Sequence, residues 1–160
     1  DWFFAAVKGA YEKGLMSGTS ATKFSPSDDT TRGMVVTILA RLDGVKTAGS
    51  NPWYAAGRTW AMTNGISDGT NMDGSVTREQ LAAILYRYAV MKGYDVRVSA
   101  SLSHYSDADK VSDWAVTAMH WAVGAGLING RSANTLAPQG TAMRAEVAAI
   151  LLRFVSLYEK

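Results

Sequence analysis

The sequence predicts a mainly α fold made of three helix–loop–helix repeats. Three observations support this: Trp2, Trp53 and Trp114 each open a similar segment, a glycine-bounded loop follows each segment, and an arginine then precedes an apolar, helix-like stretch. We expect the repeats to close around a pseudo-threefold axis, with a central three-helix bundle and room for short β segments. A linear solenoid is the alternative arrangement.

The first helix of each repeat is expected to follow its tryptophan. Small residues align four apart in the three copies: Ala6 with Ala10, Gly57 with Ala61, and Ala118 with Ala122. Such pairs on one face let two packed helix backbones approach closely. A glycine stands twelve residues after each tryptophan, at Gly14, Gly65 and Gly126. These glycines are expected to end the helix in the left-handed conformation.

The loops that follow read "GLMSG", "GISDG" and "GLING". Each ends on a further glycine, at Gly18, Gly69 and Gly130, which most simply forms a turn. The alternative is that these glycines bring backbone N–H groups close to a ligand. The distance from tryptophan to arginine is thirty residues in repeats one and three but twenty-five in repeat two, and loops tolerate such a deletion.

The second helix of each repeat is expected to begin at Arg32, Arg78 or Arg144 and to carry one apolar stripe. Thr77 and Gln80 predict a capping box, whereas the cap at Met143 should be weaker. Nine residues after each of these arginines lie Arg41, Arg87 and Arg153. We expect these second arginines to be solvated or to form salt bridges between repeats.

The repeats are predicted to span residues 1–46, 47–98 and 99–160 and to form one compact domain together. The chain opens in mid-pattern, so repeat one is expected to be N-terminally incomplete and the chain to belong to a larger protein. Sixteen Lys plus Arg against fourteen Asp plus Glu give a net charge of +2, which does not indicate a nucleic-acid partner. No apolar run reaches the roughly 18 residues of a membrane-spanning helix, so no membrane insertion is expected.

The order of tryptophan, glycine loop, Phe-x-Pro (Phe24 to Pro26), Thr-Arg and apolar helix resembles the S-layer homology domain. Repeat three adds the aromatic-x-Asp element "YSD" at Tyr105 to Asp107. The resemblance implies a pseudo-threefold, mostly helical spindle at the bacterial cell surface. It implies non-covalent anchoring of an extracellular protein to a secondary cell wall polysaccharide or a peptidoglycan-linked glycan, often one carrying pyruvate ketals.

The family's Thr-Arg-Ala-Glu motif carries over unevenly. Its arginine stands in all three repeats, its threonine at Thr31 and Thr77, and its glutamate at Glu146. We therefore expect three related but unequal sites.

The repeated arginine suggests an anion site. A helix N-terminus presents unpaired N–H groups and a partial positive charge, and an arginine there adds a fork that suits a carboxylate. A pyruvate ketal is a carboxylate, so at least one of Arg32, Arg78 and Arg144 is expected to bind ligand. The alternative partner is an internal Asp or Glu of a neighbouring repeat.

Trp2, Trp53 and Trp114 could offer flat faces to sugar rings, although core packing at the helix start is the favoured interpretation. Trp60 and Trp121 fit either a groove or the core.

The sequence argues against catalysis. The two histidines, His104 and His120, have no repeated partner, and the chain has no cysteine, so neither a metal site nor a cofactor is expected. No enzymatic activity is predicted, because no catalytic triad or carboxylate pair recurs. The alternative function is a helical-repeat domain for protein–protein interaction or surface assembly.

Overall fold

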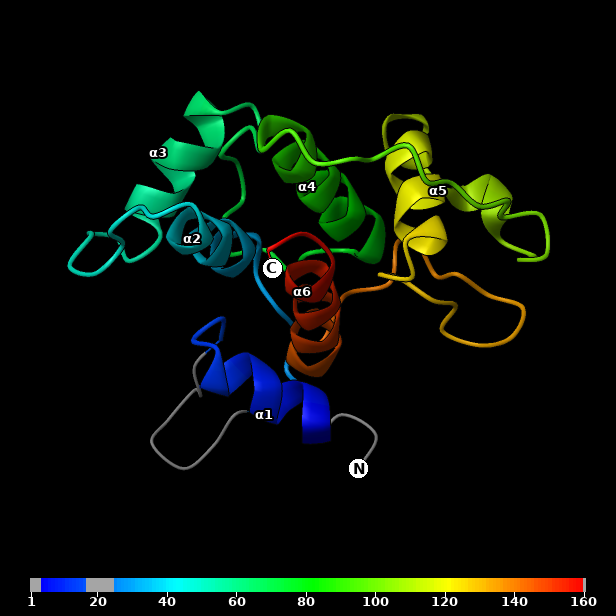
Figure 1. The fold of residues 1–160 in the computed structure, drawn as a ribbon, viewed down its shortest axis with the longest axis horizontal. Coiled ribbons are helices and arrows are strands. Elements are labelled where there is room, and N and C mark those ends of the chain that lie inside the picture. Colours follow the sequence, from blue (N-terminus) through cyan, green and yellow to red (C-terminus); the bar gives the residue numbers. More distant parts are fainter. Residues whose placement is uncertain (1–3, 17–24, 160) are drawn as a thin grey trace. The chain divides into compact units, whose positions relative to one another are not determined.

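The computed structural model describes residues 4–16 and 25–159 of the chain. Within these ranges the protein is mainly helical, as the sequence predicts (Figure 1). β structure in the described part consists of three isolated bridges, Asp29 with Met143, Thr31 with Ser75, and Thr77 with Thr141. No helix of the described ranges is both long enough and apolar enough to cross a membrane.

The helices alternate as the repeats predict. The first helices are α1 (Phe4–Glu12), α3 (Ala55–Thr63) and α5 (Val116–Gly124). The second helices are α2 (Arg32–Leu42), α4 (Arg78–Met91) and α6 (Arg144–Tyr158). Two 3-10 helices, η1 (Ala108–Lys110) and η2 (Asp113–Ala115), precede α5. Each second helix begins at the predicted arginine.

The chain forms two compact units that do not coincide with the repeats. The first unit contains residues 1–75 and 142–160, and the second contains residues 76–141. In the first unit α2 packs on α3 and α1 packs on α6, whereas in the second unit α4 packs on α5 and η2. The threefold closure and the repeat boundaries at residues 46 and 98 stay predictions.

Small residues bring helices close together, as expected. Ala10, Ala61 and Ala122 are fully buried. In the first unit, a Cβ atom built on Gly57 of α3 would lie 2.8 Å from the Cα of Thr37 in α2. Because no side chain can occupy that space without a backbone shift, the crossing of α2 and α3 depends on the glycine.

The first helices end in the predicted way. Gly14, Gly65 and Gly126 have positive φ angles of 70°, 68° and 74°. The residue after each glycine donates its N–H back into the helix: Leu15 to Ala10, Ile66 to Ala61, and Leu127 to Ala122. This bond is the 6→1 bond of a Schellman motif, and the three apolar residues that make it are buried.

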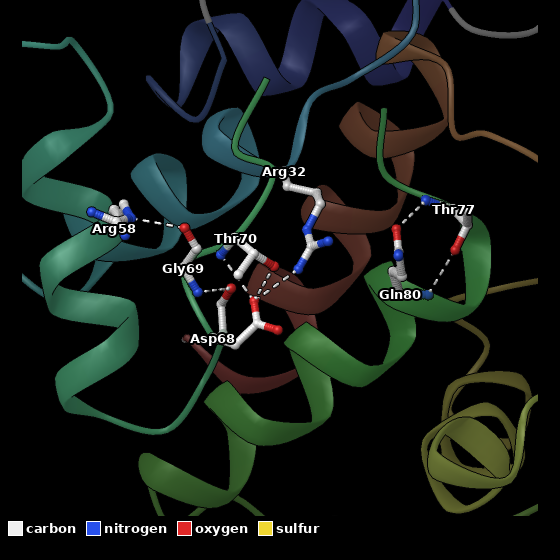
Figure 2. Close-up of polar contacts among 8 residues, drawn as sticks. Arg32, Arg58, Asp68, Gly69, Thr70, Thr77 and Gln80 are labelled. Atoms are coloured by element: carbon white, nitrogen blue, oxygen red, sulfur yellow. Dashed lines mark hydrogen bonds and ion pairs between the residues drawn. The ribbon is translucent and has the colours of Figure 1, made fainter. Parts of the chain in front are cut away.

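The side-chain caps of the second helices also follow the sequence. The Thr77 hydroxyl accepts from the N–H of Gln80 over 3.2 Å, and the Gln80 side chain accepts from the N–H of Thr77 over 2.9 Å (Figure 2). Thr31 accepts from the N–H of Met34 at the start of α2. In α6 the Glu146 carboxylate accepts from the N–H of Met143, and Met143 brings only a thioether, a weak acceptor.

The backbone donors at these helix starts are bonded to loops of other repeats. Arg32 and Gly33 donate to the carbonyl oxygens of Gly74 and Met72, Arg78 and Glu79 donate to those of Gly140 and Pro138, and Arg144 and Ala145 donate to those of Asp28 and Pro26. These six N–H···O distances lie between 2.8 and 3.0 Å. The start of α2 therefore depends on repeat two, that of α4 on repeat three, and that of α6 on repeat one.

Candidate functional site

The helix N-termini are not open anion sites. The expectation of unpaired N–H groups beside the repeated arginines is wrong, because the first two N–H groups of α2, α4 and α6 all donate to loop carbonyls. The third N–H groups of α2 and α4 donate to the capping threonines. A sequence cannot reveal this, because the accepting loops lie in other repeats.

Arg32 pairs with a carboxylate of the neighbouring repeat. Its Nη2 lies 3.2 Å from Oδ1 of Asp68, which also accepts from the N–H and the hydroxyl of Thr70 (Figure 2). The Nε of Arg32 is buried and has no hydrogen-bond partner in the described part of the chain. This arrangement matches the internal partner that the sequence left open as an alternative.

Arg78 lies in the second unit and is 4% exposed. Its Nε donates to the carbonyl oxygen of Leu136 over 2.9 Å, and its Nη2 donates to the carbonyl oxygen of Asn129. The guanidinium thus joins the start of α4 to the loop that follows α5. These contacts favour a structural role.

Arg144 is 5% exposed and lines a cavity. Burial lowers the pKa of its guanidinium from the ordinary value, and attraction to Asp28 partly offsets that effect. One of its Nη atoms lies 4.0 Å from the sulfur of Met34, which also lines the cavity. Burial removes water from the guanidinium of Arg144, and this raises the energy of its charge. An anion that binds beside it therefore stabilises it.

The tryptophans at the helix starts are exposed. Trp53 is 49% exposed and Trp114 is 54% exposed, so the core-packing interpretation is wrong for both, and Trp2 lies outside the described residues. Trp60 and Trp121 fill the core instead, at 8% and 1% exposure. The spacing of the tryptophans could not predict this difference. Trp53 and Trp114 stand ahead of α3 and α5, whereas Trp60 and Trp121 lie within these helices.

Two adjoining cavities meet at Trp53 in the first unit. The first, here called the Trp53 groove, has a volume of about 190 Å³ and is lined by Leu15, Met16, Met34, Ile38, Arg41, Trp53 and Arg144. The second, here called the linker cavity, has a volume of about 390 Å³ and is lined by Thr37, Arg41, Thr47, Ala48, Gly49, Ser50 and Trp53. Trp53 and Arg41 therefore belong to both cavities.

Arg41 was not predicted as a site residue. It lies in the last turn of α2 on the exposed side, and its guanidinium makes no hydrogen bond or ion pair with the described residues. Its nine-residue register after Arg32 was visible in the sequence, but that register fits a solvated helix position equally well. Only the fold shows that Trp53 of the next repeat lies beside it.

The loop glycines were predicted to form turns or to bring backbone N–H groups close to a ligand. The N–H of Gly69 donates to the hydroxyl of Ser67, and its carbonyl accepts from Nε of Arg58 over 2.7 Å (Figure 2). A Cβ on Gly130 would lie 2.6 Å from the Tyr105 ring, so this glycine permits close packing. Gly18 lies outside the described residues.

The corresponding helix start of the second unit contains a buried carboxylate. Glu79 is 4% exposed and accepts from the N–H and hydroxyl of Ser112 over 2.9 and 2.7 Å, and from the amide of Gln139 over 3.2 Å. Repeat one has Gly33 at this register, and a Cβ built there would lie 3.4 Å from the Trp53 ring. The second residue of the helix thus has no side chain at Gly33 and a buried carboxyl side chain at Glu79.

Asp107 of the "YSD" element binds the loop between α5 and α6 through two hydrogen bonds. The Asp107 carboxylate accepts from the N–H of Leu136 over 2.8 Å and from that of Ala137 over 2.9 Å. The first of these bonds is the main cause that lowers the pKa of Asp107, and burial opposes it. Among the described residues, no group of three His, Cys, Asp or Glu side chains could hold a metal ion.

The chain is similar in sequence to known proteins. The S-layer homology domain family matches residues 1–33 and 104–148. The chain is 30% identical to exoglucanase XynX of Acetivibrio thermocellus, over 94% of this chain and 15% of that protein. It is 23% identical to a surface-layer 125 kDa protein of Lysinibacillus sphaericus, over 94% of this chain and 14% of that protein.

An amylopullulanase of Thermoanaerobacterium thermosulfurigenes is 28% identical over 94% of this chain and 9% of its own length. The chain spans less than a fifth of each of these relatives. Similarity over so small a part of two enzymes does not extend their activity to this chain.

Proposed function

We propose that this chain, a cell-wall anchoring module that belongs to the S-layer homology domain family, binds an anionic secondary cell wall polysaccharide in the Trp53 groove. A pyruvylated polymer fits the proposal, because its ketal carries the carboxylate that an arginine fork recognises. The module would thereby hold a larger extracellular protein at the bacterial cell surface without a covalent bond and without catalysis.

One observation carries the proposal: the half-exposed ring of Trp53 lies in the same cavity as Arg41 and Arg144. An aromatic face offers apolar contact to the carbon-bound hydrogens of a sugar ring, while a few polar groups fix its orientation. Two cations beside that face select a sugar that carries negative charge. The apolar remainder of the lining strengthens the attraction by keeping water away.

The two cations would contribute differently. Arg144 is buried beside Asp28, so an incoming carboxylate offsets the cost of its desolvation and is bound in a fixed place. Arg41 is exposed and has no partner among the described residues, so it can turn toward the ligand without breaking an existing bond. We assign the main contact to Arg144 and a supporting contact to Arg41.

The other predicted residues take lesser parts in this proposal. Arg32 is paired with Asp68, and Arg78 is bonded to two carbonyl groups, so neither guanidinium is the first choice for a ligand. Trp114 has an exposed face and remains a candidate sugar contact in the second unit. The proposed sites are therefore unequal.

Sedimentation with purified cell-wall sacculi tests the proposal, with and without chemical stripping of the polysaccharide. We expect Arg41→Ala to weaken binding about tenfold, the loss of one charge-assisted hydrogen bond. The matched control is Arg87→Ala, which removes the arginine at the same register of α4 and should leave binding to the Trp53 groove unchanged. Undiminished binding to stripped walls would reject the polysaccharide and favour a protein partner.

A further inference from the structure

Within the described ranges, an Asn or Asp directly precedes a glycine at five places. A backbone nitrogen that follows Asn or Asp can attack the side-chain carbonyl carbon and close a five-membered ring. Glycine favours this attack, because it has no side chain beside its nitrogen. The five pairs are Asp43-Gly44, Asn64-Gly65, Asp68-Gly69, Asp73-Gly74 and Asn129-Gly130.

The fold engages the glycine nitrogen in four of these pairs and leaves it unengaged in the fifth. The N–H of Gly130 makes no hydrogen bond with any residue of the described ranges. A nitrogen that already donates must first give up its bond before it can react. The other four N–H groups are bonded as follows: Gly44 to the carbonyl oxygen of Arg41, Gly65 to that of Met62, Gly74 to that of Asn71, and Gly69 to the hydroxyl of Ser67.

Arg78 acts on the same peptide group as the free nitrogen. Its Nη2 donates to the carbonyl oxygen of Asn129, and its side chain is buried. When the nitrogen of Gly130 loses its proton, resonance places much of the negative charge on that oxygen. A guanidinium that donates to the oxygen stabilises this charged form, and it does so more strongly where water is scarce. Arg78 therefore makes the N–H of Gly130 easier to deprotonate.

The side chain of Asn129 is also free to react. Asn129 is exposed, and its amide makes no hydrogen bond with the described residues. Asn64 belongs to the same kind of pair and is exposed as well, but its amide donates to the carbonyl oxygen of Trp60 over 2.8 Å. Asn129 can thus turn its amide carbon toward the next nitrogen without breaking a bond, whereas Asn64 cannot.

We propose that Asn129 is a site of spontaneous deamidation, in which Gly130 supplies the attacking nitrogen and Arg78 promotes its deprotonation. Hydroxide removes the N–H proton, and the nitrogen forms a bond to the side-chain carbonyl carbon of Asn129. The side-chain amide nitrogen takes a proton from water and leaves as ammonia, so a cyclic imide remains. Water then opens the ring at one of its two carbonyl carbons and yields aspartate or isoaspartate.

The isoaspartate product would change how the loop is held. It adds one carbon to the main chain, so the carbonyl oxygen that Arg78 binds is displaced from its place. The loop after α5 would then lose a hydrogen bond to the start of α4. The aspartate product keeps the main chain as it is, and Asn129→Asp reproduces it. This proposal concerns residues outside the Trp53 groove and does not depend on the proposed function.

Peptide mass spectrometry of the whole chain, incubated at mildly alkaline pH, tests the site. We expect the amide of Asn129 to convert to acid about tenfold faster than that of Asn64, because one charge-assisted hydrogen bond favours the reaction. Isoaspartate should be found beside aspartate, since both arise from the ring. Equal rates at the two residues, or aspartate without isoaspartate, would overturn the proposal.

Asn129→Gln is the matched control for the chemistry. Glutamine keeps the amide but would have to close a six-membered ring, so we expect it to convert far more slowly at this position. If glutamine is converted as fast as Asn129, water attacks the amide directly and the nitrogen of Gly130 takes no part. That result would also overturn the proposal.

Two measurements test the part played by Arg78. Arg78→Gln removes the charge, and in the folded variant, checked by circular dichroism, we expect conversion at Asn129 to slow about tenfold while Asn64 is unchanged. An unchanged rate at Asn129 would reject the role of Arg78. Hydrogen exchange of the wild-type chain, followed by NMR, needs no variant and passes through the same deprotonated nitrogen. The N–H of Gly130 should exchange fastest of the five glycines, and protection there would overturn the proposal.

Discussion

Nε of Arg78 donates to the carbonyl oxygen of Leu136 over 2.9 Å, across 58 residues of sequence. The same guanidinium donates to the carbonyl oxygen of Asn129, and the side chain of Arg78 is buried. One arginine thus fastens the start of α4 to the loop after α5. Without it, the buried carbonyl oxygen of Leu136 and the part-buried carbonyl oxygen of Asn129 would lose this donor.

We expect Arg78→Ala to lower the free energy of unfolding by about 2–3 kcal/mol, because it removes two charge-assisted hydrogen bonds and leaves the buried carbonyl oxygen of Leu136 without this donor. Urea denaturation followed by circular dichroism measures the loss. The comparison is Arg32→Ala, which breaks an ion pair with the exposed Asp68 and should cost no more than about 1 kcal/mol. Equal losses would contradict the structural role assigned to Arg78.

The start of α6 can be improved. Met143 has the extended backbone of an N-cap residue, with φ −73° and ψ 156°, yet its thioether is a weak acceptor. Met143→Thr should raise the free energy of unfolding by about 0.5–1 kcal/mol, because a hydroxyl there can accept from the N–H of Glu146 and complete the capping box. Met143→Ala is the control and should bring no gain; a gain from alanine would mean that removal of the thioether is the cause.

The contact of α2 with α3 should not tolerate a methyl group. Gly57→Ala would place a Cβ 2.8 Å from the Cα of Thr37, so one helix must move, at a cost of about 1–3 kcal/mol. Gly9→Ala in α1 is the matched control, because its Cβ would meet only the terminal methyl groups of Leu152, which can turn aside. Thermal unfolding should show a lower Tm for the first variant and little change for the second.

Acid should weaken the loop held by Asp107. Hydrogen bonds from Leu136 and Ala137 lower the pKa of this carboxyl in the folded state, so its contribution to stability is present above the unfolded pKa of about 3.9. That contribution disappears as the pH falls through the folded value.

Asp107→Asn should therefore cost about 1 kcal/mol at neutral pH, and the difference between variant and wild type should shrink as the pH falls below about 4. Urea denaturation at a series of pH values between 3 and 7 measures it. A difference that does not change with pH would show that the charge of Asp107 is irrelevant.

The sequence predicted those features that depend on neighbours within a few residues. Gly14, Gly65 and Gly126 end their helices through bonds that span five residues, and Thr77 with Gln80 forms its box over three. Such patterns can be read directly, because the donor and the acceptor belong to one short segment.

The partners of the arginines could not be predicted in the same way. Arg32 meets Asp68 across 36 residues, and Arg78 meets Leu136 across 58. The three arginines share one register, yet each receives its surroundings from a different loop. The proximity of Trp53 and Arg41 could not be predicted from the sequence either, because it depends on how α2 packs on the start of repeat two.

The exchange of helix-start bonds between repeats has a consequence for synthesis on the ribosome. The N–H of Thr30 donates to the carbonyl oxygen of Ala142, and that of Arg144 donates to the carbonyl oxygen of Asp28. The first unit thus needs residues 142–160, which are translated after the whole of the second unit. Residues 76–141 form the second unit without residues 142–160, so the second unit can fold earlier than the first, although residues 1–75 of the first unit are translated before it.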